Sequence, residues 1–282
     1  MALDLLRIVS FNTLFGGHSG FGYGEGVHWE AQMDFLRRLE PDVLALQECN
    51  AFELLGKARL YRAVNDLGMA RGCLAEANPT TSGHRFHSAI LTSHRARVEA
   101  EDADRARYHH VLGWAKLRLP GLDRVVDLRN VHLDPLDPRN RAREVAPFEV
   151  LAAPGALSLI LGDFNTIGLD FPEPDWGKLK PHLLNGHLRL PSAQGEQAGS
   201  DRDAVALLGR AGFVDAATSF GQGHVPTAAF GEGDVPRRQD LILASPAVVL
   251  ADYRVHREPV EAGFSDHCAV SVDIDLAAMS AL

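Results

Sequence analysis

The sequence is poor in cysteine, has no excess of positive charge and contains no long hydrophobic run. Its 282 residues include three cysteines, Cys49, Cys73 and Cys268, none of which forms a CxxC pair. An odd number of widely spaced cysteines is typical of neither a disulfide framework nor a zinc ribbon, so we expect a reducing, cytoplasmic compartment. The N-terminus shows no leader pattern, and no apolar stretch is long enough to span a bilayer. We therefore expect no membrane partner.

The deficit of positive charge bears on the substrate. The chain has 28 Lys and Arg residues against 37 Asp and Glu residues, a formal net charge of −9. Coating of duplex nucleic acid by a broad basic surface is driven by counterion release, and this composition argues against that binding mode while leaving room for a local basic pocket. With 46% apolar and 23% charged residues, the chain is predicted to be globular. No segment resembles a linker, so we expect one domain over residues 1–282.

Short apolar and β-branched runs outnumber helical patterns. Strands are predicted over residues 7–12, 42–48, 86–92, 113–119, 125–132, 157–162, 239–244, 252–257 and 268–275. Helices are predicted over residues 28–40 and 51–63, after Asp137-Pro138, and from Ser200 or Asp201 to Gly212. Residues 16–26 and 170–199 are predicted as loops, the first of them a mobile rim. This order indicates an α/β fold with mixed sheets packed face to face and helices outside.

Polar and acidic residues gather where the predicted strands stop or start. If the strands that end at these residues run antiparallel to those that begin there, all of the side chains meet at one rim of the sheets. The residues are Asn12, Glu48, His132, Asp163 and Asn165 at strand ends, and Asp240, Asp266 and His267 at strand starts.

Such a rim has a chemical meaning. Clustered carboxylates repel one another unless a cation neutralises them, and oxygen ligands from Asp, Glu and Asn suit Mg²⁺ or Mn²⁺. Imidazoles and amides beside the cation are the donors that stabilise a phosphate as charge builds on its oxygens. Together, these residue types indicate metal-assisted hydrolysis of a phosphoester.

Six motifs follow one another along residues 7–275. They are Ser-Phe-Asn12, Leu-Gln-Glu48, Asn-Val-His132-Leu-Asp, Leu-Gly-Asp163-Phe-Asn165, Arg-Gln-Asp240-Leu-Ile-Leu and Ser-Asp266-His267. In this order they resemble the motifs of the endonuclease/exonuclease/phosphatase superfamily, the DNase I-like group of Mg²⁺-dependent phosphoesterases. The resemblance implies a four-layer α/β sandwich, in which two mixed β-sheets pack face to face with helices on the outer faces.

The resemblance also implies a role for each acidic and amide residue. Glu48 corresponds to the principal ligand of Mg²⁺ or Mn²⁺, and Asn12 and Asp266 complete or support this metal site. Asp163 corresponds to the base that orients and deprotonates the attacking water, and Asn165 to a donor to the substrate phosphate.

Two histidines complete the implied site. His267, held and polarised by Asp240, resembles the imidazole that stabilises the charged transition state. His132 corresponds to a second histidine that binds the phosphate or donates a proton to the leaving oxygen, and Glu76 is a candidate carboxylate partner for it. Arg141, on the helix after His132, is predicted to bind the anionic substrate, although arginines at this spacing are also typical of a solvated helix face.

Several alternatives stay open at this stage. We favour a small phosphorylated metabolite or nucleotide as substrate, partly because Leu14 stands where one nuclease branch of the family carries an acid. A DNA or RNA nuclease of the same family is the second reading, and a non-catalytic binding module that kept the fold is the third. Any one of the acidic residues alone is as consistent with a solvated charge, and the histidines with buried core residues. No obligate protein partner is evident.

Overall fold

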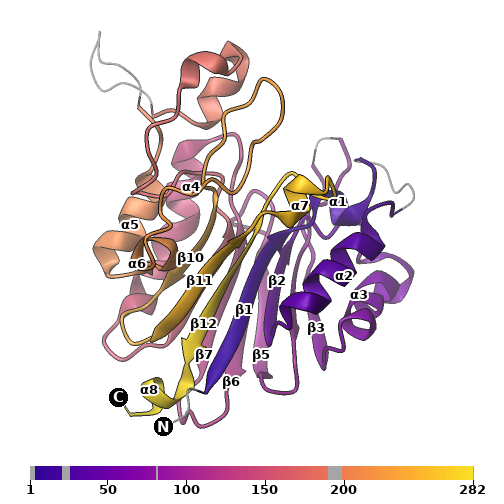
Figure 1. The fold of residues 1–282 in the computed structure, drawn as a ribbon, viewed down its shortest axis with the longest axis vertical. Helices are drawn as coiled ribbons and strands as arrows, with labels where there is room; N and C mark the ends of the chain where they lie inside the picture. Colours follow the sequence, from indigo (N-terminus) through magenta and orange to yellow (C-terminus); the bar gives the residue numbers. More distant parts are fainter. Residues whose placement is uncertain (1–3, 21–25, 81, 190–198, 282) are drawn as a thin grey trace.

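The computed structural model describes residues 4–20, 26–80, 82–189 and 199–281. Two six-stranded mixed sheets dominate this part of the chain, with strand orders β11-β12-β1-β2-β4-β3 and β5-β6-β7-β8-β10-β9 (Figure 1). The first sheet comprises β1 (Leu5–Asn12), β2 (Val43–Gln47), β3 (Arg71–Ala75), β4 (Ser88–Thr92), β11 (Leu250–His256) and β12 (Ala269–Asp275). The second comprises β5 (Arg97–Asp104), β6 (Leu112–Arg118), β7 (Val126–His132), β8 (Ser158–Asp163), β9 (Val214–Asp215) and β10 (Asp240–Ala244).

Helices lie outside both sheets. Helices α2 (Trp29–Leu39) and α3 (Leu54–Asp66) pack on the first sheet, and α4 (Pro138–Val145) and α5 (Asp203–Ala211) pack on the second, with the 3-10 helix η1 (Ala146–Ala152). The four-layer α/β sandwich is therefore confirmed. Shorter helices are α1 (Leu14–Gly17), α6 (Ala216–Ser219), α7 (Glu258–Glu261), α8 (Leu276–Ser280), and the 3-10 helices η2 (Trp176–Lys178) and η3 (Pro181–Gly186).

The apolar runs of the central strands reflect burial on both faces. In β2, Val43 and Ala45 belong to the core between the sheets, whereas Leu44 and Leu46 belong to the core beneath α2 and α3. Successive side chains of a strand point to opposite faces, so a strand between two apolar layers has no polar positions. This burial explains why β2, β4, β8 and β10 read as continuous apolar segments without alternation.

Two parallel pairs at the centre of the sheets determine where the functional residues meet. β1 runs parallel to β2, and β7 runs parallel to β8, whereas β10 and β12 pair antiparallel with β8 and β1. The carboxyl ends of the parallel strands and the starts of β10 and β12 therefore share one end of the sandwich. Figure 1 shows both chain termini at the opposite end.

The structure corrects several predicted boundaries. Strands β3, β5 and β9 were not predicted, because β5 is a largely exposed, charged edge strand and β9 has only two residues. The helix predicted over residues 51–63 spans Leu54–Asp66, and the 170–199 loop contains η2 and η3. Helix α5 begins at Asp203 and ends at Ala211, where Gly212, with a φ of 111°, terminates it as predicted. Residues 21–25 of the predicted mobile rim lie outside the described residues.

The three cysteines are free and buried, with exposed fractions of 0% for Cys49, 9% for Cys73 and 0% for Cys268. Within the described residues, no helix combines the length and apolarity needed to cross a membrane.

Candidate active site

The carboxylate of Asp163 lies at the centre of the rim formed by the strand ends. It closes β8, opposite His132 in β7 and Asp240 in β10. The residue before it must be glycine, because a Cβ on Gly162 would stand 1.9 Å from the carbonyl oxygen of Val131, and because its φ is 138°. Gly162 thus permits the close approach of β7 and β8 that sets Asp163 beside His132.

Three predicted site residues converge on one oxygen atom of Asp163. Its Oδ2 accepts a hydrogen bond from Asn12 Nδ2 at 3.2 Å and lies 3.5 Å from His132 Nε2 and 3.8 Å from His267 Nε2. The two distances to the imidazoles are longer than a direct hydrogen bond, so these contacts are electrostatic.

The other oxygen of Asp163 is fixed by the turn that follows β8. The backbone N–H of Asn165 donates to Asp163 Oδ1 at 2.9 Å, and Asn165 has a left-handed φ of 49°. Its side-chain Nδ2 donates to the Leu133 carbonyl at 3.0 Å. Since an amide nitrogen carries two hydrogens, one donor of Asn165 remains for a ligand.

Glu48 joins this cluster through Asn12. The Asn12 Nδ2 atom lies 3.2 Å from Glu48 Oε1, and the backbone N–H of Phe15 donates to Glu48 Oε2 at 2.9 Å. Glu48 itself has a φ of 55°, a conformation that L-residues adopt at a cost and that is frequent at functional sites. Burial, reinforced by the negative charge of Asp266, raises the pKa of Glu48 to about 7.

These residues fit a divalent cation. No ion pair of the described residues joins Glu48 or the exposed Asp266 to a lysine or arginine, and the positive charge of His267 offsets their mutual repulsion only in part. The described residues contain no group of three or more His, Cys, Asp or Glu side chains placed to hold a metal ion. Mg²⁺ commonly takes only one or two carboxylates from a protein and keeps several of its waters, which Glu48 and Asp266 can provide. Asn12 supports Glu48 through its amide nitrogen, while its Oδ1 accepts from the backbone N–H of Leu14.

His267 is oriented by a buried carboxylate. Its Nδ1 lies 3.0 Å from Asp240 Oδ2 and 3.1 Å from Oδ1, and Thr227 Oγ1 accepts from the backbone N–H of Asp240. Burial alone lowers the pKa of His267, but Asp240 and Asp163 outweigh it, so the net pKa is well above the usual value. Burial in turn raises the pKa of Asp240. His267 is therefore an imidazolium held beside Asp163.

His132 has a different environment. It is 4% exposed, and its Nδ1 finds no hydrogen-bond partner in the described part of the chain. Burial, together with the positive charge of His267, lowers the pKa of His132 to about 3, so its imidazole is neutral at neutral pH. The rings of His110 and Phe86 pack against it instead. Neither residue belongs to one of the six motifs, so no role was predicted for either.

Arg141 does not face the rim. It is fully buried, and its guanidinium donates to the Asp134 carbonyl at 2.9 Å, the Gly186 carbonyl at 2.8 Å and Asp201 Oδ2 at 3.0 Å. With these acceptors, Arg141 joins the segment after β7 to η3 and to the start of α5. Because the side chain is fully buried and binds groups of the protein itself, we correct the expected substrate-binding role to a structural one.

Glu76, the candidate carboxylate partner of His132, forms its ion pair with another residue. Its carboxylate lies 3.3 Å from Lys57 Nζ on helix α3, and the ring neighbours of His132 are aromatic.

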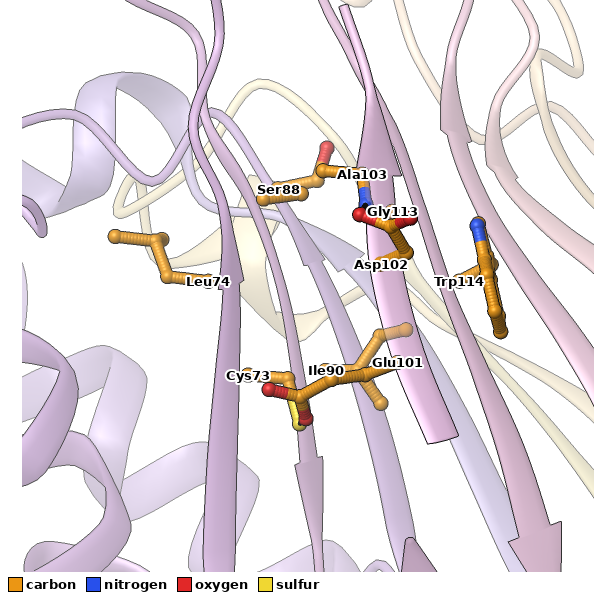
Figure 2. Close-up of a pocket in the computed structure, with 10 residues that line it drawn as sticks. Cys73, Leu74, Ser88, Ile90, Glu101, Asp102, Ala103, Gly113 and Trp114 are labelled. Carbon is orange, nitrogen blue, oxygen red and sulfur yellow. Dashed lines mark hydrogen bonds between the residues drawn. The ribbon is translucent and has the colours of Figure 1, made fainter. Parts of the chain in front are cut away.

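A separate cavity of about 220 Å³ lies between edge strands β3 and β5 and contains none of the site residues. Figure 2 shows the side chains of Cys73 and Glu101 pointing toward each other there, and the thiol contacts the carboxylate. Arg71 also pairs with Glu101, at 3.1 Å. Charged side chains on an edge strand discourage pairing with another chain, and Glu101 is one of several such residues on β5.

Comparisons with known proteins agree with this geometry. The model of the Endonuclease/Exonuclease/phosphatase family matches residues 9–267, so the chain belongs to this family. Members of the family are generally hydrolytic phosphoesterases that use divalent metal ions. No curated protein matches the sequence.

Solved structures of low sequence identity share the fold. An endonuclease/exonuclease/phosphatase family protein from Leptotrichia buccalis is 14% identical, with a TM-score of 0.65 over 96% of this chain and 99% of that one. One from Beutenbergia cavernae is 16% identical, with a TM-score of 0.65 over 96% and 71%. TDP2 from Caenorhabditis elegans is 20% identical, with a TM-score of 0.59 over 96% and 74%.

Proposed function

We propose that this protein is a Mg²⁺- or Mn²⁺-dependent hydrolase of phosphoester bonds, with a small phosphorylated metabolite or nucleotide as its substrate. The observation that carries the proposal is the convergence of Asn12, His132 and His267 on Asp163 Oδ2. A base that must hold a water in line with a phosphorus atom needs a fixed direction, and these contacts give the carboxylate of Asp163 one.

In this proposal Asp163 orients the attacking water and accepts its proton at Oδ2. The hydrogen bond from the Asn165 backbone to Oδ1 and the one from Asn12 to Oδ2 keep the carboxylate in a single orientation. General-base catalysis of this kind contributes about 10²- to 10⁴-fold to a rate. The φ of 49° at Asn165 is the backbone feature that brings its N–H to Asp163.

The two histidines act on the phosphate oxygens. His267 supplies positive charge where negative charge develops in the transition state, and Asp240 keeps its ring in position. His132, being neutral, donates or accepts one hydrogen bond through Nε2 and binds the phosphate. Protonation of the leaving oxygen, the other role expected for this residue, would need the imidazolium, which the low pKa disfavours. The remaining amide hydrogen of Asn165 is a further donor to the phosphate.

Glu48, Asn12 and Asp266 would hold the divalent cation. When bound, the cation neutralises charge on the phosphate and on the departing oxygen. The carboxylates that hold it would then no longer repel each other, which removes one cause of the raised pKa of Glu48.

The substrate class follows from charge. The net charge of −9 disfavours the phosphate-rich backbone of a polynucleotide unless basic side chains gather at the rim. Arg141, the arginine that was expected to bind the anionic substrate, is buried and engaged. A nucleic-acid substrate is the alternative outcome of the test below, and a non-catalytic module predicts no turnover at all.

The test is hydrolysis by the purified protein with Mg²⁺ or Mn²⁺, against p-nitrophenyl mono- and diesters, nucleotides, single-stranded oligonucleotides and plasmid. We expect turnover that EDTA abolishes. Asp163→Asn should lower kcat by about 10³-fold because it removes the base, and Glu48→Gln should remove most of the metal-dependent rate. Asp102→Asn, on the exposed edge strand β5, is the matched control.

Each assignment can fail separately. Full activity of Asp163→Asn would contradict the base, and metal-independent turnover would contradict the cation site. If oligonucleotides are the best substrates and their cleavage falls steeply with salt, the small-molecule preference is wrong while the hydrolase assignment stands.

A further inference from the structure

His132 lacks the hydrogen bond that usually orients a functional histidine. A ring nitrogen that does not face the substrate is normally held by a carboxylate, a carbonyl or a water, as Asp240 holds Nδ1 of His267. The Nδ1 atom of His132 is buried and finds no such partner among the described residues. Its ring orientation must therefore come from packing.

Two buried or half-buried rings supply that packing. The ring of His110 lies 4.3 Å from that of His132, centroid to centroid, with an interplanar angle of 32°. Phe86 stands nearly perpendicular to His132 at 6.2 Å and to His110 at 5.0 Å, with angles of 82° and 67°. His110 is itself 4% exposed. Offset and edge-to-face arrangements of this kind are the favoured geometries of aromatic pairs.

The same geometry argues against a proton relay. His109 lies next in the row, with its ring edge-on to His110 at 4.6 Å and its Nδ1 3.2 Å from Asp134 Oδ2. A relay needs N–H···N hydrogen bonds between successive rings, and the described residues form none between these histidines. Burial lowers the pKa of His110 to about 2, so this ring stays neutral.

We propose that His110 is a positioning residue whose buried ring, backed by Phe86, holds the imidazole of His132 against Asp163. The inference rests on the proposed hydrolysis for its kinetic consequences but not for its structural ones. It assigns a task to a residue outside the six motifs, and it predicts that the flat ring matters while the ring nitrogens do not.

The kinetic test compares His110→Ala with His110→Phe. Loss of the stacked ring should lower kcat by about 10- to 100-fold with little change in KM, because a slight misplacement of a functional group is costly. His110→Phe should retain most of the activity. His109→Ala is the control, because its ring is not in contact with His132 in the described structure. Should His110→Ala fail to fold, His110→Leu fills the same space without a flat face and carries the same expectation.

The result is overturned if His110→Phe is as damaging as His110→Ala, or if His109→Ala matches both, since each outcome points to a proton-carrying role. A double-mutant cycle adds a second criterion. In the His132→Ala background, His110→Ala should cause no further loss of kcat, whereas additive losses would show that His110 acts independently of His132.

Crystal structures of the variants give a readout that does not depend on activity. The His132 ring should adopt more than one orientation in His110→Ala and a single one in His110→Phe. If the His132 ring keeps its single orientation in His110→Ala, the positioning role is overturned, whatever the activity of the variant. If no phosphoester is hydrolysed at all, the proposed function fails while this comparison still decides the positioning role.

Discussion

His267 and His132 approach the same oxygen atom of Asp163, yet the protein holds them by different means. His267 is a cation that a buried carboxylate, Asp240, keeps in place at 3.0 Å, whereas His132 is neutral and lies among the rings of Phe86 and His110. A buried charge needs a partner of opposite charge, but a neutral imidazole costs little to pack against aromatic groups. Two histidines at one site therefore acquire different protonation states from their surroundings alone.

The two histidines also affect stability with opposite signs. The raised pKa of His267 contributes stability below the unfolded pKa, and this contribution is lost as pH rises through the folded pKa. The lowered pKa of His132 acts in reverse, because the unfolded chain takes up a proton that the folded chain refuses as pH falls below about 6.5.

The largest expected effect on stability concerns the buried ion pair between Arg141 and Asp201, which holds the segment that follows His132. Arg141→Met removes a buried cation and leaves Asp201, which is 2% exposed, without its partner. Breaking a buried ion pair from one side costs about 3 to 5 kcal/mol, so we expect the free energy of unfolding to fall by that amount. Urea unfolding of the variant and of Arg139→Met, an exposed residue of the same helix, measures the difference.

The same variant distinguishes the two roles considered for Arg141. A structural role predicts a nearly unchanged KM at temperatures where the variant is folded. A large rise in KM with unchanged stability would instead restore Arg141 as a substrate ligand.

The next largest effect concerns the ion pair between Asp240 and His267. Asp240→Asn keeps the shape of the side chain but removes the charge that sustains the His267 imidazolium, and we expect a loss of about 100-fold in kcat, as for other groups that orient a functional residue. The pKa of His267 should fall, so the loss should grow as pH rises. A pH profile of kcat for both proteins is the measurement. A uniform loss at all pH values would count against an imidazolium in the rate-determining step.

The smallest expected effect concerns the neutral rings around His132. His110→Phe removes a buried base whose pKa lies near 2 in the folded chain, so the variant should lose less stability in acid than the wild-type protein. A full proton difference between the folded and unfolded chains changes the free energy of unfolding by about 1.4 kcal/mol per pH unit. The unfolded histidine is only half protonated at pH 6.5, so the expected difference between pH 6.5 and 4.5 is about 2 kcal/mol. Urea unfolding at several pH values reports the slope. Parallel slopes for both proteins would mean that His110 is not a neutral buried group.

The motif residues were predictable because each follows or precedes a strand with a clear apolar signal. Asn12, Glu48, Asp163 and His267 meet at one rim for that reason, together with Asp240. Edge strand β5 was not predictable, because Glu101 and its charged neighbours mask the strand signal. Edge strand β3 has only five residues and begins with Arg71 and Gly72, which gives it a weak strand signal. Arg141 was misassigned because its sequence spacing fits both a solvated face and a buried one, and only the position of Gly186 and Asp201 distinguishes them.

The amino-acid sequence was sufficient to identify the family, the central strands and the residues able to carry phosphoester chemistry, since these depend on local patterns of apolar and polar residues. Only the tertiary structure decided which imidazole is charged, which arginine is buried and which rings surround His132. Those properties depend on neighbours that are distant along the chain, because desolvation and charge pairing act through space.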